Sequence, residues 1–304
     1  MLRAFRDILD AAQEGGARKL AAPCAEKKDM DFLSKAAGSG LIIPFLVGDG
    51  KAMEGMLKGL PLASLEHEII DESDPDKALA RAMGLLREGR VDMLMQGAIA
   101  HQALMDAVVD ARKGLRRGKL TSYISVFQLR KPEKLILVTD TFINNNPTLA
   151  EKQLILEHAL RLSEILGFDS PKVAALAAIE QINLNIPSTL DAAILSKMSE
   201  RKQFGKAVVE GPLDIDCALS EAAAARKGLR SVVTGNVDIY LVPEIDTGQL
   251  LAEALVFFGK LETAGALMGT TNPVILNVPF VSDENRIVEI AIAALICRKG
   301  EDHG

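Results

Sequence analysis

A regular alternation of short β-rich runs with helix-length amphipathic segments limits the possible folds more than any other feature of this chain. Helical periodicity is clearest in residues 76–88, 148–166 and 190–201. Such alternation builds βαβ units, so it predicts an α/β fold of mostly parallel sheets with helices on both faces. The predicted strands lie within residues 41–48, 65–71, 91–97, 134–141, 172–180, 206–212, 237–243, 262–269 and 273–279.

Two of the predicted helices have marked starting points. Thr148 with Glu151, and Ser188 with Asp191, fit the capping-box pattern. In that pattern a hydroxyl and a carboxylate three residues later each accept a hydrogen bond from a backbone N–H of the first turn. Both helices are therefore predicted to begin at these residues.

A chain of 304 residues is long enough for two domains. The polar, turn-rich residues 110–122 are the best candidate for one crossing between domains, and residues 269–273 for the return. We predict two α/β/α domains: residues 1–120 with 272–304 form the first, and residues 121–271 are inserted as the second. A cleft between the two domains is the expected place for a ligand.

Composition excludes several classes of protein. The net charge is −6, with two Tyr and no Trp, so neither a basic stripe nor stacking aromatic residues favour nucleic-acid binding. Three widely spaced cysteines argue against a disulfide framework and a structural zinc site, and favour the cytoplasm. Apolar runs fall well short of about 18 residues, so no membrane span is expected.

Polar residues cluster where several predicted strands end. Thr139 and Asp140 end one strand and precede Asn144; Glu180 and Asn183 end another; residues 210–220 and 242–249 end two more. Carboxyl ends of parallel strands meet at one edge of a sheet, so these residues could line a shared site. Each also has a structural explanation, because Asp and Asn commonly shape turns.

Short motifs narrow the chemistry. The chain contains no GxGxxG, GxxxxGK[ST] or HExxH sequence, so dinucleotide, P-loop and zincin sites lose their main support. The helix start at Ser188 and Thr189, and the residues around Ser122, could bind an anion through backbone N–H groups, although ordinary N-caps look the same. Gly211 and Gly235 fit either plain turns or close backbone approach to a ligand.

Taken together, four stretches resemble the phosphate acetyl- and butyryltransferases, most closely the phosphate butyryltransferase branch. They are "LVTDTFINNNPTLAEKQLIL", "STLDAAILSKMSER", "EGPLDIDCALSEAAAARKGLRS" and "GNVDIYLVPEIDTG". The resemblance implies two α/β domains similar to those of isocitrate and isopropylmalate dehydrogenases, and a homodimer. It also implies reversible transfer of a short acyl group between coenzyme A and inorganic phosphate. Coenzyme A would be a substrate, and neither a tightly bound cofactor nor a metal is implied.

The resemblance also implies roles for individual residues. Catalytic roles fall on Asp140, Asn144 and Asp216. Substrate-binding roles fall on a second set of residues: Arg116, Ser122, Thr139, Lys197, Gly211, Gly235 and Gly248.

The chain departs from the family pattern at one important place. Where family members carry a Ser-Arg pair, whose Arg binds phosphate, this chain has Val278 and Pro279. Other cations are also replaced, at Gln96, near Asp106, and at Gln249 and Glu253. Removing one donor that stabilises transition-state charge costs on the order of 100- to 1000-fold in rate.

Three hypotheses therefore stay open at the level of the sequence. The chain is a divergent phosphate acyltransferase in which Arg116, Arg117, Lys197 or Arg286 compensates for the missing Arg. Alternatively, it is a non-catalytic paralogue that binds acyl-CoA, or an acyltransferase that uses an acceptor other than phosphate.

Overall fold

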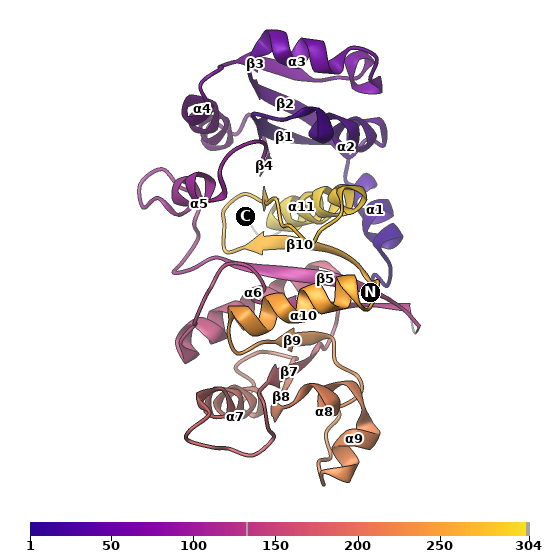
Figure 1. Cartoon of the computed structure of the whole chain (residues 1–304), viewed down its shortest axis with the longest axis vertical. Helices are drawn as coiled ribbons and strands as arrows, with labels where there is room; N and C mark the ends of the chain where they lie inside the picture. The colour runs from indigo at the N-terminus through magenta and orange to yellow at the C-terminus, as the bar shows by residue number, and fades with distance from the viewer. Residues whose placement is uncertain (132, 302–304) are drawn as a thin grey trace. The chain divides into compact units, whose positions relative to one another are not determined.

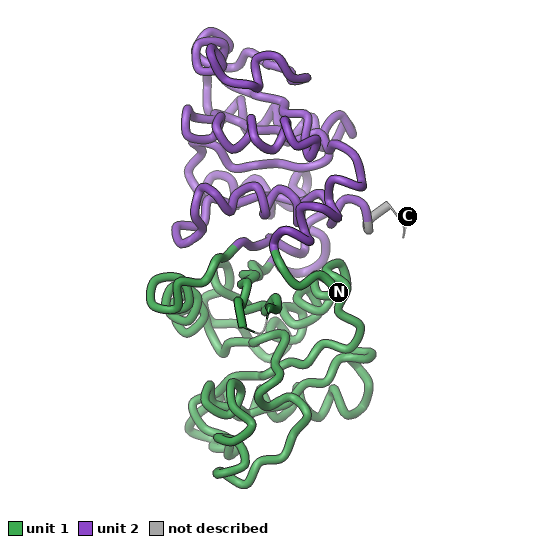
Figure 2. Tube along the Cα trace, turned by 90° about the vertical axis from the view of Figure 1, so that its right-hand side faces the viewer, with its two compact units in different colours: residues 1–4, 122–263 green, residues 5–121, 264–304 purple. Residues whose placement is uncertain are grey.

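The computed structural model describes residues 1–131 and 133–301. The chain divides into two compact units, which Figure 2 shows in different colours. The central unit comprises residues 1–4 and 122–263, and the flanking unit comprises residues 5–121 and those from 264 onward. These limits differ from the predicted ranges at residues 1–4, 121 and 264–271. The Leu2 N–H donates to the Leu166 carbonyl at 3.0 Å, which joins the N-terminus to the central unit.

The flanking unit is built on a five-stranded sheet of order β11-β4-β1-β2-β3, in which all four strand pairs are parallel. Helices α2 and α11 pack on each other, and α4 packs on β1 and β2 (Figure 1). Its elements are α1 (Phe5–Gln13), β1 (Arg18–Pro23), α2 (Lys27–Gly38), β2 (Ile42–Gly48), α3 (Gly50–Leu57), η1 (Pro61–Ser64), β3 (Glu68–Asp71), α4 (Pro75–Arg87), β4 (Met93–Met95), α5 (His101–Val109), β11 (Val274–Ile275), η2 (Asp283–Asn285) and α11 (Arg286–Glu301).

The central unit is built on a six-stranded sheet of order β10-β5-β6-β9-β7-β8. Strands β5 and β6 pair antiparallel, whereas β6, β9, β7 and β8 form consecutive parallel pairs. Its elements are β5 (Ser122–Arg130), β6 (Glu133–Thr139), α6 (Leu149–Ile165), β7 (Lys172–Leu176), α7 (Pro187–Glu200), β8 (Val208–Leu213), α8 (Ile215–Leu219), α9 (Glu221–Arg226), β9 (Ile239–Leu241) and α10 (Ile245–Phe257). Strand β10 (Glu262–Met268) begins in this unit, and its residues from 264 onward belong to the flanking unit.

The prediction of an α/β fold with mostly parallel sheets is confirmed. Two strands were not predicted, β1 and β5. The β1 sequence RKLAAP is rich in Ala, which has weak β propensity. In the part of the chain that the structure describes, no helix combines the length and apolar character that a membrane span requires.

One of the two predicted capping boxes is confirmed and the other is wrong. Thr148 accepts a hydrogen bond from the Glu151 N–H, and the Glu151 carboxylate accepts one from the Thr148 N–H. Helix α7 instead begins at Pro187, after an Ile186 N-cap that makes no side-chain cap. The Asp191 carboxylate accepts a hydrogen bond from Lys152 at 2.7 Å and so serves tertiary structure rather than the helix start.

The predicted strand at residues 273–279 is shorter than expected, because β11 ends at Ile275. Two hydrogen bonds take the chain out of the sheet ladder there. The Leu276 carbonyl accepts from the Arg286 guanidinium at 2.7 Å, and the Asn277 N–H donates to the Gln96 side chain at 2.9 Å. The residues that follow are therefore positioned by side chains instead of by a neighbouring strand.

Candidate functional site

Four polar loops leave the same edge of the central sheet. They follow β6, β9, β7 and β8, which are consecutive parallel neighbours, so their carboxyl ends lie side by side. The expectation that the polar strand ends meet at one edge is confirmed. In parallel α/β sheets this edge is where ligands usually bind.

Asp140 organises the loop after β6. Its side chain is 3% exposed and accepts hydrogen bonds from the N–H groups of Phe142 at 2.9 Å and Ile143 at 3.0 Å. The Asn144 side-chain amide also donates to it, at 2.5 Å. Burial raises the pKa of the Asp140 carboxyl, while these hydrogen bonds act in the opposite direction. The structure brings Asp140 and Asn144 together, with Asp140 as an acceptor that shapes the loop.

Helix α10 approaches this loop very closely at Gly248. A Cβ atom at Gly248 would lie 2.2 Å from the Asp140 carbonyl oxygen, nearer than real Cβ atoms come to another atom. Thr139, the last residue of β6, is fully buried; its carbonyl accepts from the Val242 N–H at 2.9 Å and its hydroxyl donates to the Tyr123 carbonyl at 3.3 Å. Gly248 and Thr139 are therefore packing residues around Asp140.

Ser122 and the other two glycines also have structural partners. The Ser122 hydroxyl lies 2.8 Å from Nδ1 of His158, whose pKa is lowered by burial. A Cβ atom at Gly211 would lie 2.8 Å from the Ala175 Cβ, so Gly211 permits β8 to pack closely. Gly235 has a φ of +70°, which favours glycine.

The two predicted cationic ligands lie in different units. Lys197 forms an ion pair with Glu200 one turn further along α7, and both side chains are exposed. Arg116 lies in the flanking unit, where it forms an isolated bridge with Thr270, and it is exposed. Nine of the ten predicted site residues thus lie in the central unit, and Arg116 lies in the other.

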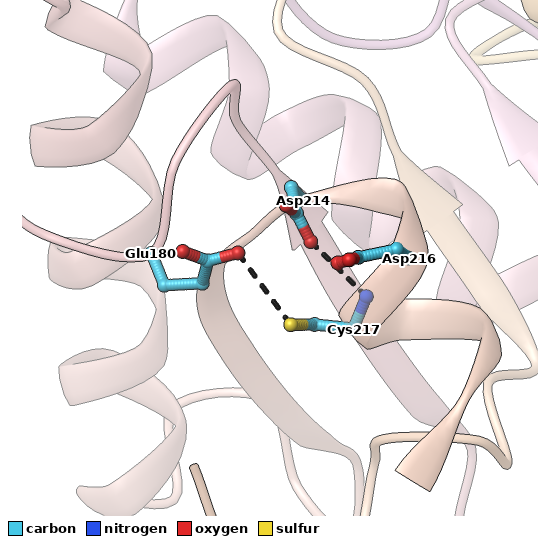
Figure 3. Close-up of side chains that lie close together, drawn as sticks. All are labelled: Glu180, Asp214, Asp216 and Cys217. Atoms are coloured by element: carbon cyan, nitrogen blue, oxygen red, sulfur yellow. Dashed lines mark hydrogen bonds between the residues drawn. The ribbon is translucent and has the colours of Figure 1, made fainter. Parts of the chain in front are cut away.

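Asp216 belongs to a cluster of three carboxylates and a thiol after β7 and β8, shown in Figure 3. The ligand atoms of Glu180, Asp214, Asp216 and Cys217 all lie within 4.8 Å of one another. The Asp214 carboxylate also accepts from the Cys217 N–H at 3.0 Å and so caps α8. By composition this donor set suits a cation.

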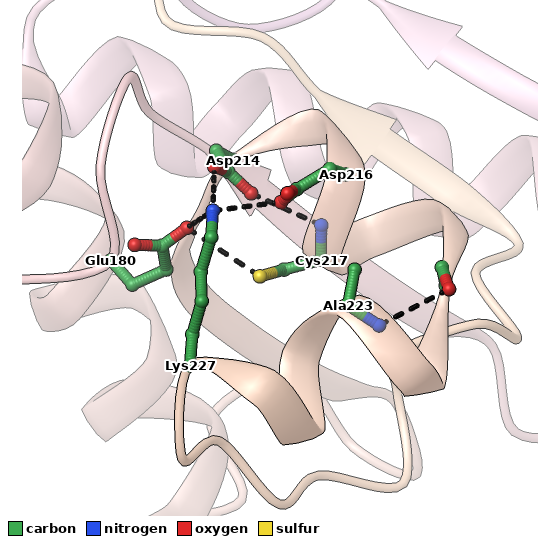
Figure 4. A network of polar contacts seen from close by, with 7 residues as sticks. Glu180, Asp214, Asp216, Cys217, Ala223 and Lys227 are labelled. Atoms are coloured by element: carbon green, nitrogen blue, oxygen red, sulfur yellow. Dashed lines mark hydrogen bonds and ion pairs between the residues drawn. The ribbon is translucent and has the colours of Figure 1, made fainter.

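The positive charge in this cluster comes from Lys227, the residue after α9 (Figure 4). Its Nζ atom donates to Glu180 at 2.6 Å, to Asp216 at 2.9 Å and to Asp214. These hydrogen bonds raise the Lys227 pKa, and the hydrogen bond from Lys227 lowers the pKa of Glu180 to about 2. Burial, aided by the neighbouring carboxylates, raises the pKa of the Cys217 thiol to about 12, so the thiol stays protonated.

The segment that replaces the Ser-Arg pair lies in the flanking unit and is apolar. Val278, Phe280 and Val281 are 1%, 4% and 7% exposed, whereas Pro279 is exposed. Arg286 does not substitute for the missing Arg, because it is 8% exposed, donates to the Leu276 carbonyl and lies 3.6 Å from Glu289.

The remaining replaced cation positions make hydrogen bonds within the protein. Gln96 is 4% exposed, donates to the Ile99 carbonyl at 2.8 Å and accepts from the Asn277 N–H. The Asp106 carboxylate accepts from Gln102 at 2.8 Å. On α10, Gln249 donates to Glu253 at 3.0 Å.

Sequence reasoning missed Lys227 and Lys152. Lys152 is 7% exposed and pairs with Asp191 across α6 and α7, at a distance of 2.7 Å. An ammonium that pairs with residues tens of positions away leaves no local pattern. The only signal available was the gathering of Glu180, Asp214 and Asp216 at adjacent strand ends, which calls for a compensating cation.

The fold has close counterparts among solved structures. A branched-chain phosphotransacylase from Enterococcus faecalis V583 superimposes with a TM-score of 0.79 and 26% identity, covering 92% of this chain and 99% of that chain. The architecture is therefore that of the phosphotransacylases. The predicted likeness to isocitrate and isopropylmalate dehydrogenases stays a prediction.

Sequence comparison then gives the family. Residues 25–294 match the family model described as "Phosphate acetyl/butaryl transferase". The phosphate butyryltransferase of Clostridium acetobutylicum is 35% identical over 97% of this chain and 99% of its own length. The phosphate acetyltransferase of Thermotoga maritima is 33% identical over 96% and 99%. The chain belongs to this family of transferases.

Proposed function

We propose that the chain is a divergent phosphate acyltransferase that moves a short acyl group between coenzyme A and inorganic phosphate. The coenzyme A thiolate attacks the carbonyl carbon of the acyl phosphate. A C–S bond forms, the C–O bond to phosphate breaks, and phosphate leaves with the electron pair. A carboxylate takes the thiol proton, and no covalent enzyme intermediate forms.

One observation carries this proposal. Three of the four family-like stretches supply the loops at the carboxyl edge of the central sheet: residues 140–144 after β6, 213–217 after β8 and 242–248 after β9. Asp140 and Asn144 shape the first loop, and the half-exposed Asp216 carboxylate follows β8. The proposed site thus lies at the edge of the sheet to which the family-like stretches contribute their loops.

The absence of the Arg is expected to slow the transfer reaction. Lys197 and Arg286 are held by Glu200 and the Leu276 carbonyl, so the exposed Arg116 and Arg117 are the candidates left from the sequence for compensating the missing Arg. A turnover lower by about 100- to 1000-fold than in a relative with the Ser-Arg pair follows from the loss of one such donor.

A second candidate is a protein that binds acyl-CoA without transferring the acyl group. The buried Val278 favours it, because an apolar side chain occupies the position at which the family pattern has a hydroxyl. An apolar segment there also suits an acceptor other than phosphate. Acyl-CoA hydrolysis or acyl transfer at a rate independent of phosphate would identify an acyltransferase with another acceptor.

We also propose that the protein works in the cytoplasm as a homodimer formed through α10. Leu250, Phe257 and Phe258 are 68%, 57% and 89% exposed, whereas Gly248 and Ala252 on the opposite face are buried. An apolar helix face of this kind marks an interaction surface. Asp246 lies in the first turn and Lys260 follows the last, so antiparallel packing of two copies brings opposite charges together at both ends.

Thiol release from acetyl-, butyryl- and branched-chain acyl-CoA, with and without phosphate, tests the proposed activity. Release that depends on phosphate supports a phosphate acyltransferase and identifies the acyl group. Coenzyme A binding without release would instead support the second candidate.

A further inference from the structure

The Lys227 ammonium lies at the carboxyl edge of the central sheet and has no assigned role in the proposed reaction. It lies in hydrogen-bond contact with three carboxylates from two different loops: Glu180 follows β7, and Asp214 and Asp216 follow β8. Figure 4 shows the lysine side chain reaching from the end of α9 into the middle of this group. One residue therefore ties α9 to both loops.

The three carboxylates are not equivalent. Glu180 and Asp214 have side chains 17% and 23% exposed, and each has a second partner: the Cys217 thiol for Glu180 at 3.5 Å and the Cys217 N–H for Asp214. The Asp216 side chain is 51% exposed and lies 2.9 Å from Lys227. Asp216 is thus the carboxylate that stays accessible to a substrate while the ammonium fixes its orientation.

Without the ammonium, three negative charges would lie within 4.8 Å of one another. Like charges at such distances repel, and a carboxylate relieves the repulsion by turning towards water or by taking up a proton. Asp216 has the most freedom to turn away, because its side chain is the most exposed of the three.

We propose that Lys227 is a positioning residue of the transfer site, whose ammonium fixes the orientation of the half-exposed Asp216 carboxylate at the edge. This inference rests on the proposed function, in which Asp216 contacts the substrate. Lys227 itself touches no reacting atom. It supplies an internal cation at a place where carboxylate clusters in other proteins bind a metal ion.

Lys227→Ala tests the inference, with Lys206→Ala as the matched control because Lys206 pairs with a single exposed carboxylate, that of Asp169. Misplacing a site group by about 1 Å costs roughly 100-fold in rate, so kcat/KM is expected to fall by about that factor in Lys227→Ala and to stay unchanged in Lys206→Ala. The acid limb of the kcat/KM profile should also move to higher pH, because carboxylates that lose a cationic neighbour hold their protons longer.

Chemical rescue provides the sharpest readout. Propylammonium, which carries the same N–H donors as the missing side chain, should restore part of the activity and the thermal stability of Lys227→Ala. Tetramethylammonium, a cation without N–H donors, should not. Lys227→Arg should retain more activity than Lys227→Ala, and Asp216→Asn should lower the activity of wild type far more than that of Lys227→Ala.

A Lys227→Ala protein with lowered stability but wild-type kcat/KM and an unmoved pH profile would overturn the proposal, leaving Lys227 a purely structural group. If Lys227→Ala does not fold, Lys227→Arg and its double mutant with Asp216→Asn give the same comparison. If wild type releases no thiol, the proposed function fails, and coenzyme A affinity with propylammonium rescue still tests Lys227. Equal affinity in wild type and Lys227→Ala would then contradict its role.

Discussion

The Gln96 side chain accepts a hydrogen bond of 2.9 Å from the backbone N–H of Asn277, and so fixes the chain just before Val278 and Pro279. A second hydrogen bond, from the Asn277 amide to the Gly97 carbonyl at 3.1 Å, strengthens the same connection. The segment that replaces the Ser-Arg pair is therefore held in place by this link, the two hydrogen bonds that Asn277 donates. A neutral residue suits this link, because no charge has to be buried.

Gln96→Ala should destabilise the protein by about 2 kcal/mol, because the half-buried Asn277 N–H and the buried Ile99 carbonyl both lose a partner. Urea unfolding monitored by circular dichroism measures this change. Gln249→Ala removes a hydrogen bond between half-buried side chains on α10, and its effect should stay within about 0.5 kcal/mol. Equal effects of the two substitutions would contradict the importance of the Gln96 link.

Pro279→Arg should raise phosphate-dependent turnover by roughly 10- to 100-fold, because it returns one cation to the position of the missing Arg. Pro279 is exposed, so the new side chain needs no burial and stability should hardly change. Pro279→Met controls for the loss of the proline ring.

Adding Val278→Ser tests the other half of the pair. Val278 is 1% exposed, so this change should cost about 1 to 3 kcal/mol, which thermal unfolding would detect. Turnover in Pro279→Arg no higher than in Pro279→Met would show that the other replaced cations limit the reaction as well.

Gly248→Ala should lower the free energy of unfolding by about 2 to 3 kcal/mol, because the new methyl group would lie 2.2 Å from the Asp140 carbonyl oxygen. Gly55, an exposed glycine within α3, has open space around it, so Gly55→Ala should stabilise the protein by about 0.5 to 1 kcal/mol. Denaturant titration of the two variants compares them directly. A neutral Gly248→Ala would mean that α10 does not depend on this close approach.

Glu180 should contribute stability in a defined pH range. Its folded-state pKa of about 2 lies below the ordinary value of 4.5, so its contribution is present above pH 4.5 and is lost as the pH falls towards 2. The difference in unfolding midpoint between wild type and Glu180→Gln should therefore shrink across that range. A difference that stays constant across that range would argue against the Lys227 interaction.

The double substitution Leu250→Asp with Phe257→Asp should convert the proposed homodimer to a monomer in multi-angle light scattering, because it places charges on the apolar face of α10. Leu184 is 79% exposed in the loop after β7, so Leu184→Asp serves as the control and should leave the dimer intact. Asp246→Lys alone should weaken the dimer and Asp246→Lys with Lys260→Asp should restore it. A wild-type monomer would contradict the proposal.

Sequence patterns predicted the features that depend on strand order and on neighbouring residues. The strand ends at Asp140 and Glu180 were predicted to meet, because parallel strands place their carboxyl ends together. The Thr148 capping box was also predicted, since both partners lie within one turn. The early end of β11 could not be predicted, because the Gln96 side chain that accepts from the Asn277 N–H lies 181 residues away in sequence, just after β4.

The site was predicted less completely than the fold. Asp140, Asn144 and Asp216 were selected from the resemblance, but only the structure shows that Lys227 neutralises Asp216 and that Lys197 pairs with Glu200. Long flexible cations choose their partners by tertiary geometry. Their assignment from one sequence is consequently the weakest step.

Thiol release from butyryl-CoA at high enzyme concentration, measured with and without phosphate, tests the central claim most directly. The account predicts slow release that requires phosphate and yields acyl phosphate, with Pro279→Arg faster than wild type. Coenzyme A binding with no release under any condition would contradict it.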